Sequence, residues 1–124
     1  ATCGCNPLAC SVAQAALEVI IEENLAENAF NLGVYFREEL NKFIKDSPIV
    51  KLVRGKGLLN AIVINDTEES NTAWNLCLEM KNNGLLAKPT HGNIIRFAPP
   101  LVMNEAQLLD CVSIITETLS KFEK

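Results

Sequence analysis

The sequence predicts an α+β fold, in which helices cover one face of a small antiparallel or mixed sheet. Stretches with helical spacing of apolar residues alternate with short β-rich stretches, in the order α-α-β-α-β-β-α. Two of the short strands follow each other directly after a helix, which is typical of an α+β layer. Of the 124 residues, 48 % are hydrophobic, which is enough to form a core.

The first part of the chain is predicted to form two helices. Asn6 and Pro7 are an N-cap residue and a proline at the first helical position, and the Ala-rich apolar run after them predicts a largely buried helix. A second helix is expected to start near Asn24 and to end before Pro48, which cannot continue it. Its apolar residues follow steps of three and four: Leu25, Ala29, Leu32, Phe36, Leu40 and Phe43.

A strand and a third helix are expected next. The β-rich run of residues 58–64 predicts the strand, and Gly55 and Gly57 predict a bend or a close backbone approach at its start. The helix is expected over residues 66–83, with Gly84 as the residue that follows its end. Its predicted apolar face consists of Ala73, Leu76, Cys77 and Met80.

The last part of the chain is predicted to form two short strands and a final helix. "LLAKPTHG" and "NIIRFAPP" are read as strands around a turn that contains Pro89 and Gly92. Asn104 is the expected cap of the helix, with Gln107 three residues later as in a capping box. The expected buried stripe of this helix is Leu108, Val112, Ile115, Leu119 and Phe122.

Charge and cysteine usage exclude several classes of function. The formal net charge is −4, and without a Lys/Arg cluster this argues against nucleic acid or an anionic membrane as partner. No apolar run reaches the roughly 18 residues that cross a bilayer. Five cysteines at irregular spacing favour free thiols in a reducing compartment. The cytoplasm is therefore expected, with the mitochondrial matrix as the alternative.

The same cysteines do not predict a metal site. Cys3, Cys5 and Cys10 have the pattern C-x-C-x4-C, which is not a zinc spacing, and the chain has one histidine. Cys77 and Cys111 lie on apolar helix faces and are expected to be core thiols.

Arg96 is the candidate binding residue, because it interrupts an apolar run that is expected to be buried. A buried guanidinium is costly unless it is paired. One interpretation is a structural ion pair. The other is an anion clamp, since arginine is always charged and its rigid fork matches a carboxylate.

Two further stretches could carry chemistry. "TCGCNP" (residues 2–7) precedes a helix, so it is either an anion site at the helix start or an ordinary capped turn. His91 lies in a glycine-containing turn, where a loop histidine without chemistry is favoured over a catalytic base.

The chain also contains four stretches that match one known protein family: "CNPLAC", "VRGKGLLNAIVI", "NGLLAKPTHG" and "IIRFAPPLV". In order and spacing they resemble the pyridoxal-phosphate-dependent aminotransferases of fold type I, in the subgroup that acts on ω-amines. The resemblance covers all 124 residues and corresponds to the C-terminal part of such an enzyme. It implies that residues 1–24 end the large cofactor-binding domain and that residues 25–124 form the C-terminal small domain.

The resemblance also implies roles for two residues. Arg96 matches the arginine that grips the substrate carboxylate. Thr2 matches a threonine that contacts the phosphate of pyridoxal 5'-phosphate in the neighbouring subunit, so a homodimer with a shared active site is implied. Cys3 and Cys5 depart from the family pattern, where an aromatic residue and a glycine stand. The lysine that forms the Schiff base precedes this segment in the family, so no catalytic residue is expected here.

The implied activity is transfer of the δ-amino group of ornithine to 2-oxoglutarate, which gives glutamate semialdehyde and glutamate. Acetylornithine or aminobutyrate as the amino donor are the alternatives. A second hypothesis of another class is a non-catalytic α+β module that binds a small anion through Arg96.

Overall fold

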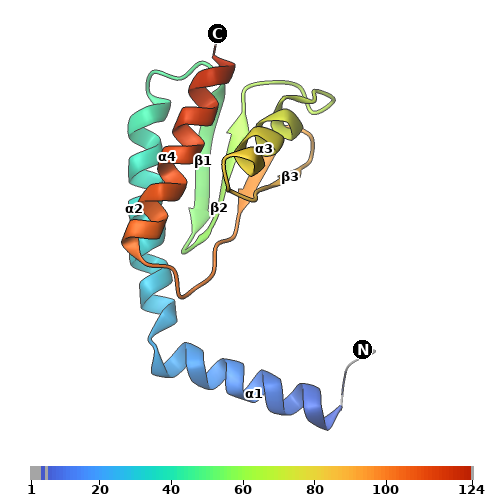
Figure 1. Ribbon diagram of the computed structural model, residues 1–124, viewed down its shortest axis with the longest axis vertical. Coiled ribbons are helices and arrows are strands. Elements are labelled where there is room, and N and C mark those ends of the chain that lie inside the picture. Colours follow the sequence, from blue (N-terminus) through green and yellow to red (C-terminus); the bar gives the residue numbers. More distant parts are fainter. Residues whose placement is uncertain (1–3, 5, 124) are drawn as a thin grey trace.

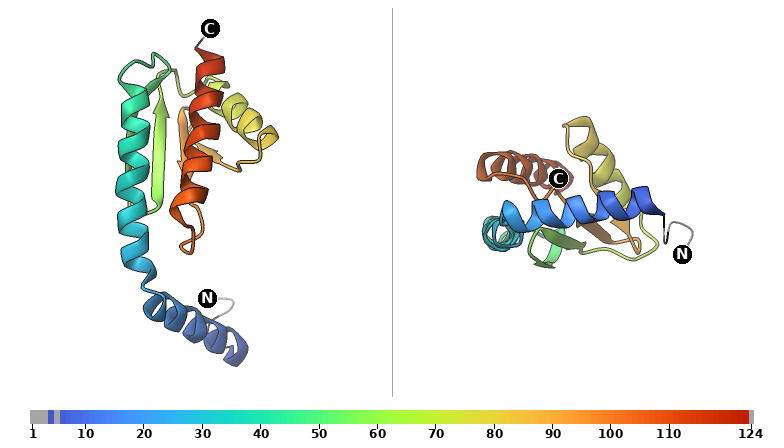
Figure 2. Two further views of the ribbon diagram at one scale, coloured as in Figure 1. Left: turned by 60° about the vertical axis from the view of Figure 1, so that its left-hand side comes forward. Right: turned by 90° about the horizontal axis from the view of Figure 1, so that it is seen from below.

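The computed structural model describes residues 4 and 6–123. A four-stranded antiparallel sheet carries helices on one face, and a further helix projects away from it (Figures 1 and 2). In chain order the elements are α1 (Pro7–Glu22), α2 (Leu25–Ile44), β1 (Val50–Lys56), β2 (Leu59–Ile64), α3 (Thr72–Asn82), β3 (Lys88–Thr90), β4 (Ile94–Phe97) and α4 (Glu105–Phe122). The predicted α+β class, with helices on one side of the sheet, is confirmed.

The core lies between the sheet and three helices. The strand order is β1-β2-β4-β3, and every neighbouring pair is antiparallel. Side chains from alternate positions of β2 and β4 pack against α2, α3 and α4 in one apolar cluster. Its fully buried members include Leu40, Ile62, Ile64, Leu76, Met80, Ile95, Leu108, Ile115 and Leu119.

The start of α1 follows the prediction, but its burial does not. The Asn6 side chain accepts hydrogen bonds from the backbone N–H groups of Leu8 (2.9 Å) and Ala9 (3.4 Å), and Pro7 opens the helix. Within this chain, however, no residue of α1 is buried, because the helix leads away from the sheet (Figure 1). The expectation of a largely buried helix is therefore wrong for the chain taken alone. No helix in the described part of the chain is long and apolar enough to cross a membrane.

Strand β1 was missing from the sequence-based order of elements. It is an edge strand in which only Val50 is buried, so it lacks a continuous apolar signal. Gly57, with φ +54°, lies in the tight turn that joins β1 to β2. The glycine pair therefore serves a hairpin, and a side chain at Gly55 would collide with Asn60.

Helix α3 is shorter than predicted, because a polar loop takes up residues 66–71. The Asp66 carboxylate accepts hydrogen bonds from the Thr67 backbone N–H and from the hydroxyls of Ser70 and Thr72. These bonds offer the backbone an alternative to a helix. The helix end is as expected, since Gly84 has a positive φ of 95°.

Helix α4 begins as predicted. Asn104 and Gln107 form the capping box, in which each side chain bonds the other residue's backbone N–H. In the expected stripe Leu108, Ile115 and Leu119 are buried, as predicted. Val112 is half-buried against the core, and Phe122 at the end is exposed.

Candidate functional site

Arg96 lies on the open face of the sheet, opposite the helices. Its neighbours Ile95 and Phe97 are buried in the core, and successive side chains of a strand point to opposite faces. Arg96 is therefore exposed in this chain, and the expectation that it is buried is wrong. The reason is that helices cover one face of the sheet only.

Within the described part of the chain, Arg96 forms no hydrogen bond or ion pair. Its direct neighbours across the sheet are Ala61 on β2 and Lys88 on β3. The structural ion pair proposed from the sequence thus finds no support among these residues. An exposed guanidinium without a partner remains available to an anion.

The sheet register arranges the open face in rows. Arg54, Ala61, Arg96 and Lys88 are successive cross-strand partners, so they form one row, which we call the cationic row. The next row on the same face is Leu52, Val63, Ile94 and Thr90. A cationic row thus runs beside a largely apolar one.

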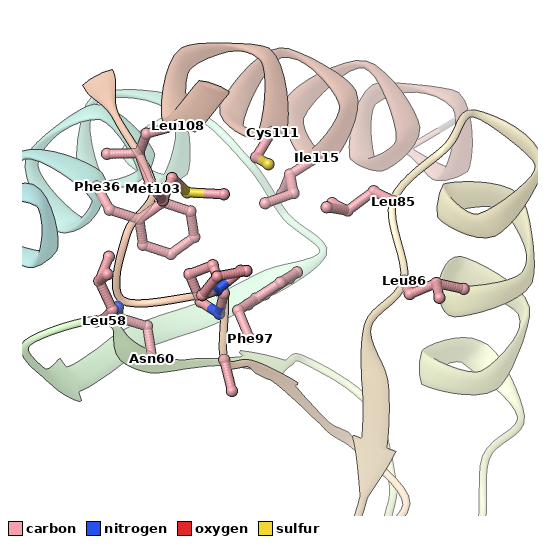
Figure 3. A pocket seen from close by; sticks show the side chains of 13 residues that line it. Phe36, Leu58, Asn60, Leu85, Leu86, Phe97, Met103, Leu108, Cys111 and Ile115 are labelled. Atoms are coloured by element: carbon pink, nitrogen blue, oxygen red, sulfur yellow. The ribbon is translucent and has the colours of Figure 1, made fainter. Parts of the chain in front are cut away.

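A cavity of about 190 Å³ lies on the other side of the sheet (Figure 3). Phe36, Phe97, Leu108 and Ile115 are among its mostly apolar lining residues. Arg96 does not line this cavity. A carboxylate clamp needs a cation, so the open face is the better candidate site.

The polar group at this cavity is already satisfied by the fold. Asn60 is 2 % exposed. Its side chain donates to the Gly57 carbonyl (3.0 Å) and accepts from the Arg37 guanidinium (2.8 Å). Arg37 also donates to the Gly57 carbonyl (3.1 Å), so these groups fasten α2 to the β1–β2 turn. Gly33 allows this close approach, because a Cβ there would lie 1.9 Å from the Gly57 carbonyl oxygen.

At the N-terminal candidate, Thr2, Cys3 and Cys5 lie outside the described residues. The described helix start favours the capped-turn interpretation. Leu8 and Ala9 donate to the Asn6 side chain, and the Cys10 N–H donates to the Asn6 carbonyl (2.9 Å). The first backbone donors of α1 are therefore already used.

The two thiols near the core differ in burial. Cys77 is buried, as predicted, and burial raises the pKa of its thiol to about 11. Cys111 is half-buried at the cavity, and burial, with the nearby Asp110 carboxylate, raises its pKa as well. Neither thiol has the lowered pKa of a reactive nucleophile.

His91 occupies the turn between β3 and β4 with a positive φ of 50°. Its side chain forms no hydrogen bond with the described residues, so nothing in this arrangement prepares it as a base. In the part of the chain that the structure covers, no three His, Cys, Asp or Glu side chains gather as a metal site would require.

Comparison with known proteins identifies the family. The model of the class-III aminotransferases matches residues 1–119, and the chain belongs to this family. Its helices and small antiparallel sheet are those of solved fold type I aminotransferases.

Individual relatives are similar over most of the chain. This chain is 60 % identical to the mitochondrial ornithine aminotransferase of Drosophila melanogaster over 118 residues, which is 95 % of the present chain. An acetylornithine aminotransferase from Elizabethkingia anophelis has 64 % identity and a TM-score of 0.92 over 94 % of this chain and 30 % of its own.

A third relative carries information on a cofactor. The ornithine aminotransferase from Toxoplasma gondii, described with partial occupancy of PLP at its active site, has 38 % identity and a TM-score of 0.85. That match covers 94 % of this chain and 27 % of the Toxoplasma chain. The present chain spans 26 % of the length of the Drosophila relative.

Proposed function

We propose that this chain belongs to an ornithine δ-aminotransferase, which transfers the δ-amino group of ornithine to 2-oxoglutarate and forms glutamate semialdehyde and glutamate. The proposal depends mainly on one observation: Arg96 is exposed on the open face of the sheet and has no partner among the described residues. The names of the Drosophila and Toxoplasma relatives support the choice of ornithine.

Arg96 binds the α-carboxylate of 2-oxoglutarate or glutamate in this proposal. The guanidinium can donate two parallel hydrogen bonds to one carboxylate, which fixes orientation as well as position. Strand β4 holds the residue from both sides, because Ile95 and Phe97 are anchored in the core. A clamp on a strand is more precisely placed than one on a loop.

The cofactor in this proposal is pyridoxal 5'-phosphate, which supplies an electron sink when bound. Thr2 is the residue of this chain that contacts its phosphate, in the neighbouring subunit of a homodimer with a shared active site. A hydroxyl donor suits a phosphate oxygen. The backbone N–H groups of Leu8 and Ala9 at the start of α1 already donate to the Asn6 side chain.

We further propose that residues 1–24 belong to the large cofactor-binding domain and residues 25–124 to the small domain. Two features support this boundary. Asn24 has a left-handed conformation (φ +53°) between the two helices, and α1 packs none of its residues into the core.

The second candidate donor is acetylornithine, which the name of the Elizabethkingia relative favours. Aminobutyrate has no such support among the relatives described above. For the compartment, the mitochondrial Drosophila relative favours the mitochondrial matrix over the cytoplasm.

The test is the variant Arg96→Lys in the full-length enzyme. Lysine keeps the charge but loses the fork, so 2-oxoglutarate binding should weaken by about 2–4 kcal/mol, or roughly 30-fold or more in KM. Steady-state kinetics with ornithine and 2-oxoglutarate measure it. The matched control is Arg54→Lys, in the same row but two strands away. An unchanged KM for 2-oxoglutarate in Arg96→Lys would contradict the clamp.

A further inference from the structure

The sheet carries a charge of the opposite sign to the whole chain. The formal net charge of the chain is −4, yet its four strands contain no Asp or Glu. They contain the cations Lys51, Arg54, Lys56, Lys88 and Arg96. Three of these cations stand in the cationic row.

Lys88 has the closest relation to Arg96. The two residues are direct partners in the antiparallel pair of β3 and β4, so their side chains leave the same face of the sheet. Directly opposite residues have Cβ atoms about 4.5–5.5 Å apart, and like charges at such positions destabilise a sheet. This juxtaposition is therefore a cost to the fold.

Nothing in the described part of the chain offsets that cost. Lys88 forms no ion pair or hydrogen bond there, and neither does Arg96. Two lysines on the helices do find acids, since Lys42 pairs with Glu39 and Lys121 with Glu79. Local conflicts of this kind are expected where a sequence is shaped by a ligand rather than by folding.

We propose that Lys88 is a second cation of the Arg96 site and that it determines specificity for doubly charged acceptors. This inference rests on the proposed function of Arg96. Arginine supplies the geometry through its fork, whereas the lysine ammonium acts as a point charge on a flexible stem. A dicarboxylate gains more from this added positive charge than a monocarboxylate does, because it carries twice the charge.

The expected effect is modest, because Lys88 is exposed. Exposed charge pairs contribute little, so loss of the ammonium should raise KM by about two- to fivefold. Salt should reduce the effect, since the screening length falls to about 8 Å near physiological ionic strength.

The experiment uses the full-length enzyme and the variant Lys88→Gln. We expect the KM for 2-oxoglutarate to rise about two- to fivefold at low salt, with kcat and the KM for ornithine unchanged. With pyruvate as a monocarboxylate acceptor the rise should be smaller. Lys88→Arg should restore the wild-type KM. The matched control is Lys81→Gln, an exposed lysine on α3 at the helical side.

A second measurement does not depend on turnover. In the absence of ornithine, 2-oxoglutarate should raise the melting temperature of Lys88→Gln less than that of the wild type or of Lys81→Gln. If Lys88→Gln matches the wild type in KM, salt dependence and thermal shift while the wild type is active with ornithine, the role of Lys88 is overturned. A wild type that responds to 2-oxoglutarate but does not transaminate ornithine would instead overturn the proposed function.

Discussion

At the scale of single residues, Arg96 is exposed on the open face of the sheet, between the buried side chains of Ile95 and Phe97. The sequence predicts a binding role for Arg96 because its neighbours are apolar, and it also predicts helices on only one face of the sheet. The alternation of buried and exposed side chains along β4 could not be read from the run Ile94-Ile95, because Ile94 is apolar although it lies half-buried on the open face. The cross-strand neighbours of Arg96 could not be predicted, because only the strand register brings Lys88 and Ala61 beside it.

Cys77 provides a pH-dependent test at this scale. Burial raises the pKa of its thiol from 9.0 to about 11, so the folded protein keeps a proton that the unfolded chain has lost. The resulting stability is fully present below pH 9 and is lost as the pH rises through 11. Over this range the free energy of unfolding should fall by about 2 kcal/mol more in the wild type than in Cys77→Ala.

Urea unfolding of both proteins at pH 8 and pH 11 measures this difference. The difference in the free energy of unfolding between the wild type and Cys77→Ala at each pH removes the contributions of other titrating groups. A gap between wild type and Cys77→Ala that stays constant with pH would show that the thiol is not protected by burial.

At the scale of elements, the caps were more predictable than the strands. Helix starts at Asn6 and Asn104 depend on local residues alone, and both were predicted correctly. Strand β1 was missed because it is an edge strand stabilised by pairing with β2 rather than by its own burial. The start of α3 was placed too early, because hydrogen bonds to Asp66 decide it and periodicity does not.

The capping box of α4 can be tested by Asn104→Ala. The Asn104 side chain accepts a hydrogen bond from the Gln107 N–H (2.9 Å), and its loss leaves that donor unpaired. We expect the protein to lose about 0.5–2 kcal/mol of stability. The matched control is Asn71→Ala, because Asn71 stands at the same position of α3 without a side-chain cap bond. Thermal melts of both variants measure the effect, and equal losses would contradict the assigned role of the cap.

At the scale of the whole molecule, α1 and the sheet differ in how far their apolar side chains are buried. The core joins the sheet to α2, α3 and α4, whereas α1 contributes no buried residue. Leu8, Leu17 and Ile21 are 74 %, 61 % and 77 % exposed. The sequence predicted burial from their number, but burial depends on what covers the helix, which this chain does not supply.

This imbalance predicts how the isolated chain behaves. Residues 1–124 expressed alone should self-associate, because α1 exposes apolar side chains on more than one face. Residues 25–124 should remain smaller at the same concentration, since the core lies within them. Size-exclusion chromatography with light scattering compares the two. The double variant Leu17→Glu/Ile21→Glu is the matched control and should reduce the association of residues 1–124 without altering the core. If residues 1–124 are a monomer with a cooperative melt, α1 does not need a cover, and the anion-binding module becomes the better description of the chain.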